Sequence, residues 1–198
     1  DIEIIGHWHI GVDAAHFGDD ESVIHMRRGR FNMPQIKRRG LDGTQLAGLV
    51  EEQCRTLEAS GGHICSITIE LDGPGVSCYD HLRLGKYRPL VNGIHTGARQ
   101  SDDANYNLRA LLWRRAKEYL QDKPVHLPND QDLRIQISSM LYSFKDGLLL
   151  MQKKPEYKKM YGRSPDSADA FILTMADPKK NPSRKPSQSS GNSSWVDF

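Results

Sequence analysis

The sequence lacks any apolar run long enough to cross a membrane, and its start is not that of a secretory signal. Spanning a bilayer takes roughly 18–20 consecutive apolar residues, and the opening Asp-Ile-Glu-Ile has neither a basic start nor a long apolar core. We therefore expect no membrane association. The chain also opens without Met and runs almost directly into a strand-like segment, which suggests a domain cut from a longer protein.

Cysteine is scarce, and the three that occur do not form a disulfide pattern. Cys54, Cys65 and Cys78 are odd in number, show no paired spacing and lie among apolar neighbours. Such residues are typical of reduced core positions in a cytosolic protein rather than of a metal or redox site. The sequence therefore predicts an intracellular location.

Net charge is also small, so bulk electrostatics does not by itself indicate a nucleic-acid partner. The chain has 198 residues and a formal charge of +2, with 37% hydrophobic and 26% charged residues, which is ordinary for one globular α/β domain. The basic residues are clustered, however, and although charge runs are usually solvated faces, one cluster precedes the last predicted helix. Its members are the candidate DNA contacts Lys153, Lys154, Lys158, Lys159 and Arg163.

Hydrophobic periodicity predicts a mixed α/β order. Strand patterns alternate with helix patterns, and Lys145-Asp146-Gly147 is a hairpin signal between two apolar runs. Thr44 is the predicted cap of the first helix, and Ser164 caps the last, with Pro165 in its first position. Strands are expected at 7–13, 22–28, 31–37, 64–70, around 90–91, 142–144 and 148–151, and helices at 44–61, 75–82, 105–120, 130–141 and 164–175.

Residues 177–198 have a different composition from the rest. They are rich in Pro, Ser and Lys, and their only large apolar residues are Trp195, Val196 and Phe198. Such a segment cannot bury a core, so we predict one folded domain over 1–176 and a flexible basic, Ser-rich tail over 177–198. The small apolar end is suited to docking on a partner.

Acidic residues stand where a two-metal phosphodiesterase would need them. Asp13 closes the first predicted strand, Glu70 closes the most apolar strand, and Asp166 and Asp169 share a face in the first turns of the last helix. Mg²⁺ prefers hard oxygen ligands, and a pair of ions requires several converging carboxylates. Each acid alone is more often a turn residue or a helix-dipole partner. Asp72 is the alternative second-strand ligand, and spacing alone does not choose between it and Glu70.

With these blocks in this order, the chain resembles the nuclease domain of the large terminase subunit of tailed bacteriophages, part of the headful DNA-packaging motor. The resemblance covers essentially residues 7–176. It is carried by GVDAAHFGDDESVI (11–24), IELDGPGVSCYDHL (69–82), NYNLRALLW (105–113) and KPEYKKMYGRSPDSADAF (154–171).

The resemblance implies an RNase H-like fold of the resolvase and integrase type, with a mixed sheet flanked by helices and an added β-hairpin. It also implies two-metal hydrolysis of double-stranded DNA with Mg²⁺ or Mn²⁺. The family's acids fall on Asp13, Glu70, Asp166 and Asp169, with Asp166 the preferred direct ligand, and Lys154 matches a basic residue upstream of the last helix. This register makes Asp72 the less favoured ligand.

The resemblance also implies a context for the domain. Terminases carry an ATPase domain with a Gly-Lys-Ser/Thr loop, which is absent from this sequence. The expected partners are double-stranded concatemeric DNA, that ATPase domain, the portal protein and the small terminase subunit, in the host cell cytoplasm. Two alternatives stay open: a resolvase-type nuclease acting on branched DNA, and a non-catalytic module that docks on DNA or the portal.

Overall fold

A mixed β-sheet forms the middle layer of the computed structural model, which describes residues 3–15, 20–99 and 103–178. The strand order is β3-β2-β1-β5-β6, with β4 also paired to β2. β1, β5 and β6 run parallel, and β2 is antiparallel to β1. The strands are β1 (Trp8–Asp13), β2 (Ser22–Arg28), β3 (Phe31–Asn32), β4 (Ile36–Arg38), β5 (Ile64–Glu70) and β6 (Val91–Ile94).

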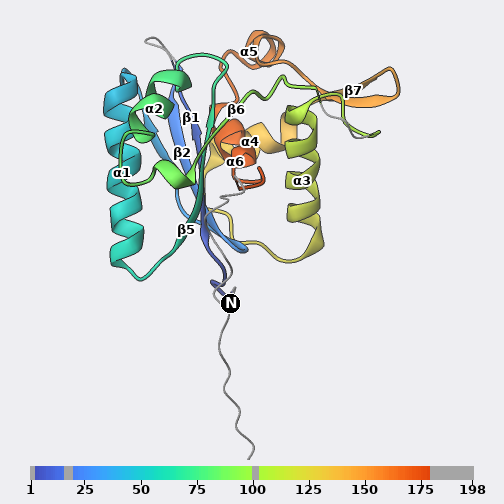
Figure 1. The fold of residues 1–198 in the computed structure, drawn as a ribbon. Coiled ribbons are helices and arrows are strands. Elements are labelled where there is room, and N and C mark those ends of the chain that lie inside the picture. The colour runs from blue at the N-terminus through green and yellow to red at the C-terminus, as the bar shows by residue number, and fades with distance from the viewer. Residues whose placement is uncertain (1–2, 16–19, 100–102, 179–198) are drawn as a thin grey trace, which may run out of the picture.

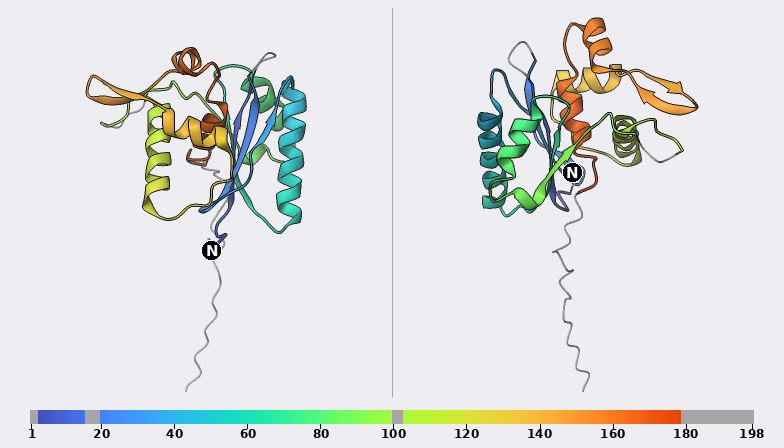
Figure 2. Two further views of the ribbon diagram at one scale, coloured as in Figure 1. Left: turned by 180° about the vertical axis from the view of Figure 1, so that it is seen from behind. Right: turned by 45° about the horizontal axis from the view of Figure 1, so that its top comes forward.

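Helices cover both faces of this sheet (Figures 1 and 2). One face carries α1 (Gly43–Ala59) and α2 (Gly75–Leu82). The other carries α6 (Asp166–Leu173), with α3 (Leu108–Asp122) and α4 (Gln131–Ser139) packed outside it. This arrangement confirms the predicted α/β class.

A hairpin and one short helix extend from the end of the molecule opposite the N-terminus (Figure 1). A two-stranded hairpin consists of β7 (Tyr142–Lys145) and β8 (Leu148–Met151), and its turn places Asp146 and Gly147 at positive φ. It confirms the hairpin predicted from Lys-Asp-Gly. A single 3₁₀ turn, η1 (Arg88–Leu90), precedes β6, and α5 (Lys154–Tyr161) follows the hairpin.

Several predicted boundaries were wrong for local reasons. The strand expected over 31–37 is two short strands, because Pro34 cannot donate to the ladder and interrupts it. The cap of α1 is Asp42 rather than Thr44, and it forms a reciprocal capping box with Gln45. Helix α5 was not predicted, since its sequence is mostly polar and buries only Tyr157.

The two faces of the sheet differ in chemistry because side chains alternate along each strand. On β1, Trp8, Ile10 and Val12 belong to the core under α1 and α2. Gly11 instead faces α6, where a Cβ would lie 2.1 Å from the carbonyl oxygen of Ala170. Only a residue without a side chain permits this approach, so α6 packs almost on the backbone of β1.

No helix in the described ranges is long and apolar enough to span a bilayer. Cys54 and Cys78 lie in the core, and Cys65 is half-buried. Burial raises the pKa of both core thiols to about 12. The predicted tail, apart from Asp177 and Pro178, lies outside the described residues.

Candidate active site

Two parallel strands end side by side and present acids to the same face. Asp13 is the last residue of β1 and Glu70 the last of β5, and the pairing of Val12 with Ile69 puts them at the same level. Both lie on the face covered by α6, by the alternation that buries Ile69 on the other side. Asp13 is 4% exposed and Glu70 8% exposed.

The chain leaves Glu70 by a tight turn, which accounts for the Gly-Pro-Gly segment. A Cβ on Gly75 would lie 1.9 Å from the carbonyl oxygen of Glu70, so α2 begins against the end of β5 only because residue 75 has no side chain. This turn keeps the chain that follows from covering the carboxylate.

Helix α6 supplies the third acid, Asp169, which is 2% exposed. The helix starts at Asp166, with Pro165 in the cap position and no side-chain cap from its own segment. The cap expected from Ser164 is therefore wrong. Gln136 of α4 takes this role, because its Oε1 accepts the backbone N–H of Ala168 at 3.0 Å.

The ammonium group of Lys154 joins the three acids. Its Nζ lies 3.1 Å from Asp13 Oδ1, 2.5 Å from Glu70 Oε2 and 3.2 Å from Asp169 Oδ2. We call these four residues the acid cluster. Lys154 is the first residue of α5, which lies over this end of the sheet (Figure 1). The acid cluster thus unites four elements on a single cation.

Two further side chains hold the carboxylates from behind. Thr96, in the loop after β6, donates its hydroxyl to Glu70 Oε1. Arg109, in the first turn of α3, places Nη1 2.8 Å from Asp169 Oδ1 as an ion pair, and its backbone N–H donates to the carbonyl oxygen of Thr96. Both residues are buried. Glu70 and Asp169 therefore each have one oxygen held from behind and the other turned toward Lys154.

The acids influence one another electrostatically. Burial raises the pKa of Asp13 well above its usual range, and the nearby charges of Asp169 and Glu70 raise it further, against the opposing effect of Lys154. Burial also acts to raise the pKa of Glu70, but the charge and hydrogen bonds of Lys154 and the Thr96 hydroxyl outweigh it and lower the value. Lys154 alone thus does not balance the negative charge.

Two predicted acids lie apart from the shared cation. Asp166 accepts the backbone N–H of Glu21 at 3.1 Å, and burial raises its pKa. Asp72 is 2.6 Å from Nδ1 of His95, on the exposed side of the loop. The structure thus brings Asp13, Glu70 and Asp169 together, with Asp166 one helical turn away and Asp72 outside. The ligand role of each residue stays a prediction.

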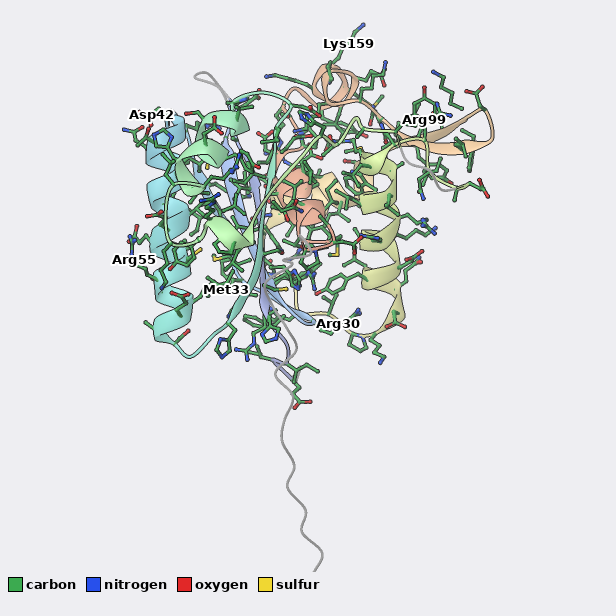
Figure 3. The ribbon with its side chains drawn as sticks, viewed as in Figure 1. Arg30, Met33, Asp42, Arg55, Arg99 and Lys159 are labelled. Carbon is green, nitrogen blue, oxygen red and sulfur yellow. The ribbon has the colours of Figure 1, made fainter. Side chains whose placement is uncertain are left out.

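The predicted basic cluster divides into paired and exposed residues. Lys154 points into the acid cluster, Lys158 pairs with Asp20 at 2.7 Å, and Arg163 pairs with Asp132 at 2.7 Å. Lys153 and Lys159 are exposed, and Lys159 projects from the outer side of α5 (Figure 3). As DNA contacts, all five stay predictions.

Arg109 and Thr96 were missed by the sequence analysis. Arg109 lies inside an amphipathic helix rich in arginine, and nothing in its spacing distinguishes it from the exposed ones. Thr96 follows a weak four-residue strand. Only burial, at 7% and 6% exposure, singles them out.

No metal-binding group of three or more His, Cys, Asp or Glu side chains is present within the described ranges. In the acid cluster the Lys154 ammonium lies between the carboxylates at the distances given above. In this structure the Lys154 ammonium is thus the cation that contacts all three carboxylates.

Comparison with known proteins identifies the fold. A scan against protein-family models finds no match, and no curated protein matches in sequence. The fold class is RNase H-like. It rests on the sheet order, the flanking helices and the solved structures that match.

More particularly, the fold is that of large terminase nuclease domains. The nuclease domain of the large terminase subunit gp2 of bacterial virus Sf6 matches with a TM-score of 0.69 at 16% identity, over 89% of this chain and 90% of that one. A variant of it with manganese and beta-thujaplicinol matches at 0.68 and 17%, over 89% and 90%. The large terminase nuclease of thermophilic phage G20c matches at 0.58 and 15%, over 85% and 80%. The predicted resemblance is confirmed in the fold.

Proposed function

We propose that this domain is a divalent-metal-dependent endonuclease that cuts concatemeric double-stranded viral DNA during genome packaging. The observation that carries the proposal is the acid cluster, in which carboxylates from β1, β5 and α6 converge on one cation. The fold supports it, since the similar Sf6 and G20c domains are terminase nucleases.

The donor set fits hard divalent cations. Three carboxyl groups converge beside two cations, Lys154 and Arg109, and these cations do not offset the burial and the charges of Asp169 and Glu70 that raise the pKa of Asp13. A hard divalent cation would supply the missing positive charge. Solved relatives carry manganese (Sf6) and magnesium (G20c). Asp13, Glu70 and Asp169 would hold the metal, with Asp166 at the edge. Two Mg²⁺ or Mn²⁺ ions bound there would lower the pKa of a water and neutralise charge on the phosphate.

The chain's own residues prepare this site. Arg109 holds Asp169 Oδ1, and Thr96 holds Glu70 Oε1, so the remaining oxygens face a common centre. Lys154 has a side chain 30% exposed and begins a surface helix, so it can move from the centre toward a phosphate. Lys153 and Lys159 would bind the DNA backbone beyond it, with Lys158 and Arg163 released from their ion pairs. Phosphate contacts of this kind give salt-dependent affinity.

The domain would act in the host cell cytoplasm as part of a larger motor. The ATPase domain of the full-length chain would supply translocation, and the portal and small subunit would supply location and specificity. The isolated domain is expected to cut with little sequence preference.

The direct test is cleavage of supercoiled plasmid with Mn²⁺ by the Asp13→Asn variant. A neutral amide cannot supply the anionic ligand, so activity should fall roughly a thousand-fold or more while the circular dichroism spectrum stays unchanged. Asp80→Asn, at an exposed position on α2, is the matched control and should cut normally. Near-normal nicking by folded Asp13→Asn would refute the site.

A second experiment separates the two candidate acids of the β5 end. Glu70→Gln should lose as much activity as Asp13→Asn, because Glu70 faces the shared centre. Asp72→Asn should retain a measurable fraction, because Asp72 turns to His95. The reverse ranking would place the second ligand at Asp72.

The two alternatives predict different substrates. A resolvase-type nuclease would prefer a four-way junction over linear duplex of the same length. A docking module would bind DNA or the portal and cut neither. The intact acid cluster favours cleavage, and the parallel assay on both substrates decides between packaging nuclease and resolvase.

A further inference from the structure

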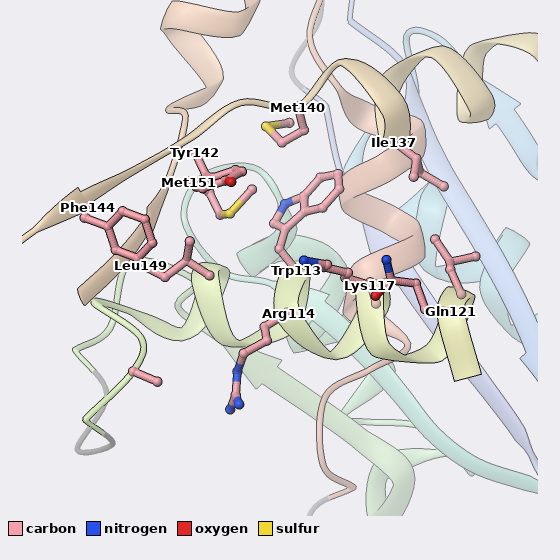
Figure 4. A pocket seen from close by; sticks show the side chains of 13 residues that line it. Trp113, Arg114, Lys117, Gln121, Ile137, Met140, Tyr142, Phe144, Leu149 and Met151 are labelled. Carbon is pink, nitrogen blue, oxygen red and sulfur yellow. The ribbon is translucent and has the colours of Figure 1, made fainter. Parts of the chain in front are cut away.

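An apolar groove lies away from the acid cluster, between α3, the end of α4 and the β7–β8 hairpin (Figure 4). Its volume is about 650 Å³, within the size range of binding pockets. Its floor contains Trp113, Leu120, Met140 and Met151. Tyr142 and Phe144 of the hairpin border it and are 65% and 69% exposed. Exposed aromatic residues around an apolar hollow are typical of an interaction site.

The groove also contains hydrogen-bond donors that need acceptors. The indole N–H of Trp113, a residue 7% exposed, meets no acceptor among the described residues. A buried donor left unpaired is costly. Lys117, also on the groove, is exposed and has no ion pair in the described part of the chain. The occupant should therefore combine apolar side chains with an acceptor or a negative charge.

We infer that the groove binds the C-terminal segment of this same chain, Trp195-Val196-Asp197-Phe198. The segment contains the only large apolar residues beyond Asp177, and between them one carboxylate. Trp195 and Phe198 would fill the floor, where the thioethers of Met140 and Met151 favour aromatic neighbours. A peptide carbonyl would accept the indole N–H of Trp113, and Asp197 would pair with Lys117.

The chain geometry allows this contact. Asp177 is tied to α3 by an ion pair with Arg115 at 2.9 Å, so the tail starts beside the helix that forms the groove floor. The sixteen residues 179–194 span up to roughly 50 Å when extended, and α3 is roughly 22 Å long. A tethered segment acts at millimolar effective concentration, so a contact with a dissociation constant below about 1 mM would be mostly formed.

Hydrogen exchange of the hairpin amides in the full 198-residue chain tests the inference. Residues 142–151 should exchange about tenfold faster in Trp195→Ala/Phe198→Ala than in the parent, because the segment no longer covers them. Leu84→Asp, at an 88% exposed position away from the groove, is the matched control and should change nothing. Unchanged exchange in the double variant would overturn the inference. It is the result expected if the groove binds another protein rather than this segment.

A charge reversal keeps the test independent of packing damage. Lys117→Glu should speed hairpin exchange by repelling Asp197, and adding Asp197→Lys should restore the parent rate. Lack of restoration would contradict the assignment of Asp197. A hairpin protection that rises with protein concentration would show that the occupant is a second copy, which would also overturn it. Plasmid cleavage is not used here, so failure of the proposed function leaves this outcome unaffected.

Discussion

The two faces of the sheet differ in the side chains that they bury. Toward α1 and α2, the strands present Ile10, Val12, Ile67 and Ile69, all fully buried and all apolar. Toward α6, the same strands present His9, Gly11, Asp13, Ser66, Thr68 and Glu70. A single period-two alternation thus separates the residues that stabilise the domain from those that build its acid cluster.

Polar groups are buried on one face of the sheet and not on the other. The α6 face buries acids only because each meets a cation or a hydroxyl from another element. The α1 face is apolar, so truncating one of its side chains should lower stability without changing the acid cluster. Four substitutions or conditions test this separation, beginning with the one expected to lower both stability and activity.

Gly11→Ala should damage both stability and activity. The added Cβ would lie 2.1 Å from the Ala170 carbonyl oxygen, so α6 must move away from β1 and carry Asp169 with it. We expect the free energy of unfolding to fall by ~1–3 kcal/mol and the cleavage rate to fall far below that of the parent. Urea unfolding and plasmid nicking check both. Parent-like activity would show that α6 need not sit so close.

Ile67→Ala, on the opposite face, should damage stability alone. Removing a fully buried side chain from the core under α1 costs ~2–5 kcal/mol. Below its melting temperature the folded variant should cut at nearly the parent rate. A strong loss of turnover in the folded variant would break the proposed separation of faces.

Acidification should destabilise the α6 face through His25. This histidine of β2 is completely buried, contacts Phe171 and is held by Asn32 and Gln35. Burial lowers its pKa from 6.5 to about 4. The unfolded chain therefore binds the proton first, and stability is full above about pH 6.5 and falls as the pH drops toward 4, by up to about 3 kcal/mol.

The measurement is urea unfolding between pH 4 and 7, compared with His25→Gln. The variant should lose much of this pH dependence, although half-buried His9, whose pKa burial also lowers to about 4, will leave a remainder. An unchanged profile in His25→Gln would contradict the assignment.

Arg109→Gln should weaken metal binding, because it removes the buried cation that pairs with Asp169. Without the guanidinium, Asp169 loses the contact at 2.8 Å that orients it. Loss of such an outer partner typically costs roughly 10–100-fold in metal affinity or activity. Mn²⁺ binding by calorimetry should weaken accordingly, and Arg109→Lys should recover part of it. Equal Mn²⁺ affinity in Arg109→Gln and the parent would leave Arg109 only a structural role.

Much of this architecture was predictable from local patterns. The alternation around Ile64–Glu70 and the spacing of the long helix at 108–122 predicted their elements, and Lys145-Asp146-Gly147 predicted the hairpin. Helix α5 escaped because a polar, proline-containing segment with one buried tyrosine has no apolar stripe to detect. Its position over the sheet end is what brings Lys154 to the acids.

Side-chain alternation is a local property of the backbone, so the strand-end acids and the face they share could be predicted from the sequence. It identified Asp13, but the preference for Glu70 over Asp72 came from the family resemblance and not from alternation. The packing of distant segments, in contrast, makes Asp169 rather than Asp166 the partner of Lys154 and turns Asp72 to His95. It also brings Arg109 and Thr96 to the carboxylates. These partners lie many residues apart, and their contacts depend on how α3, α5 and α6 pack, which no local pattern encodes.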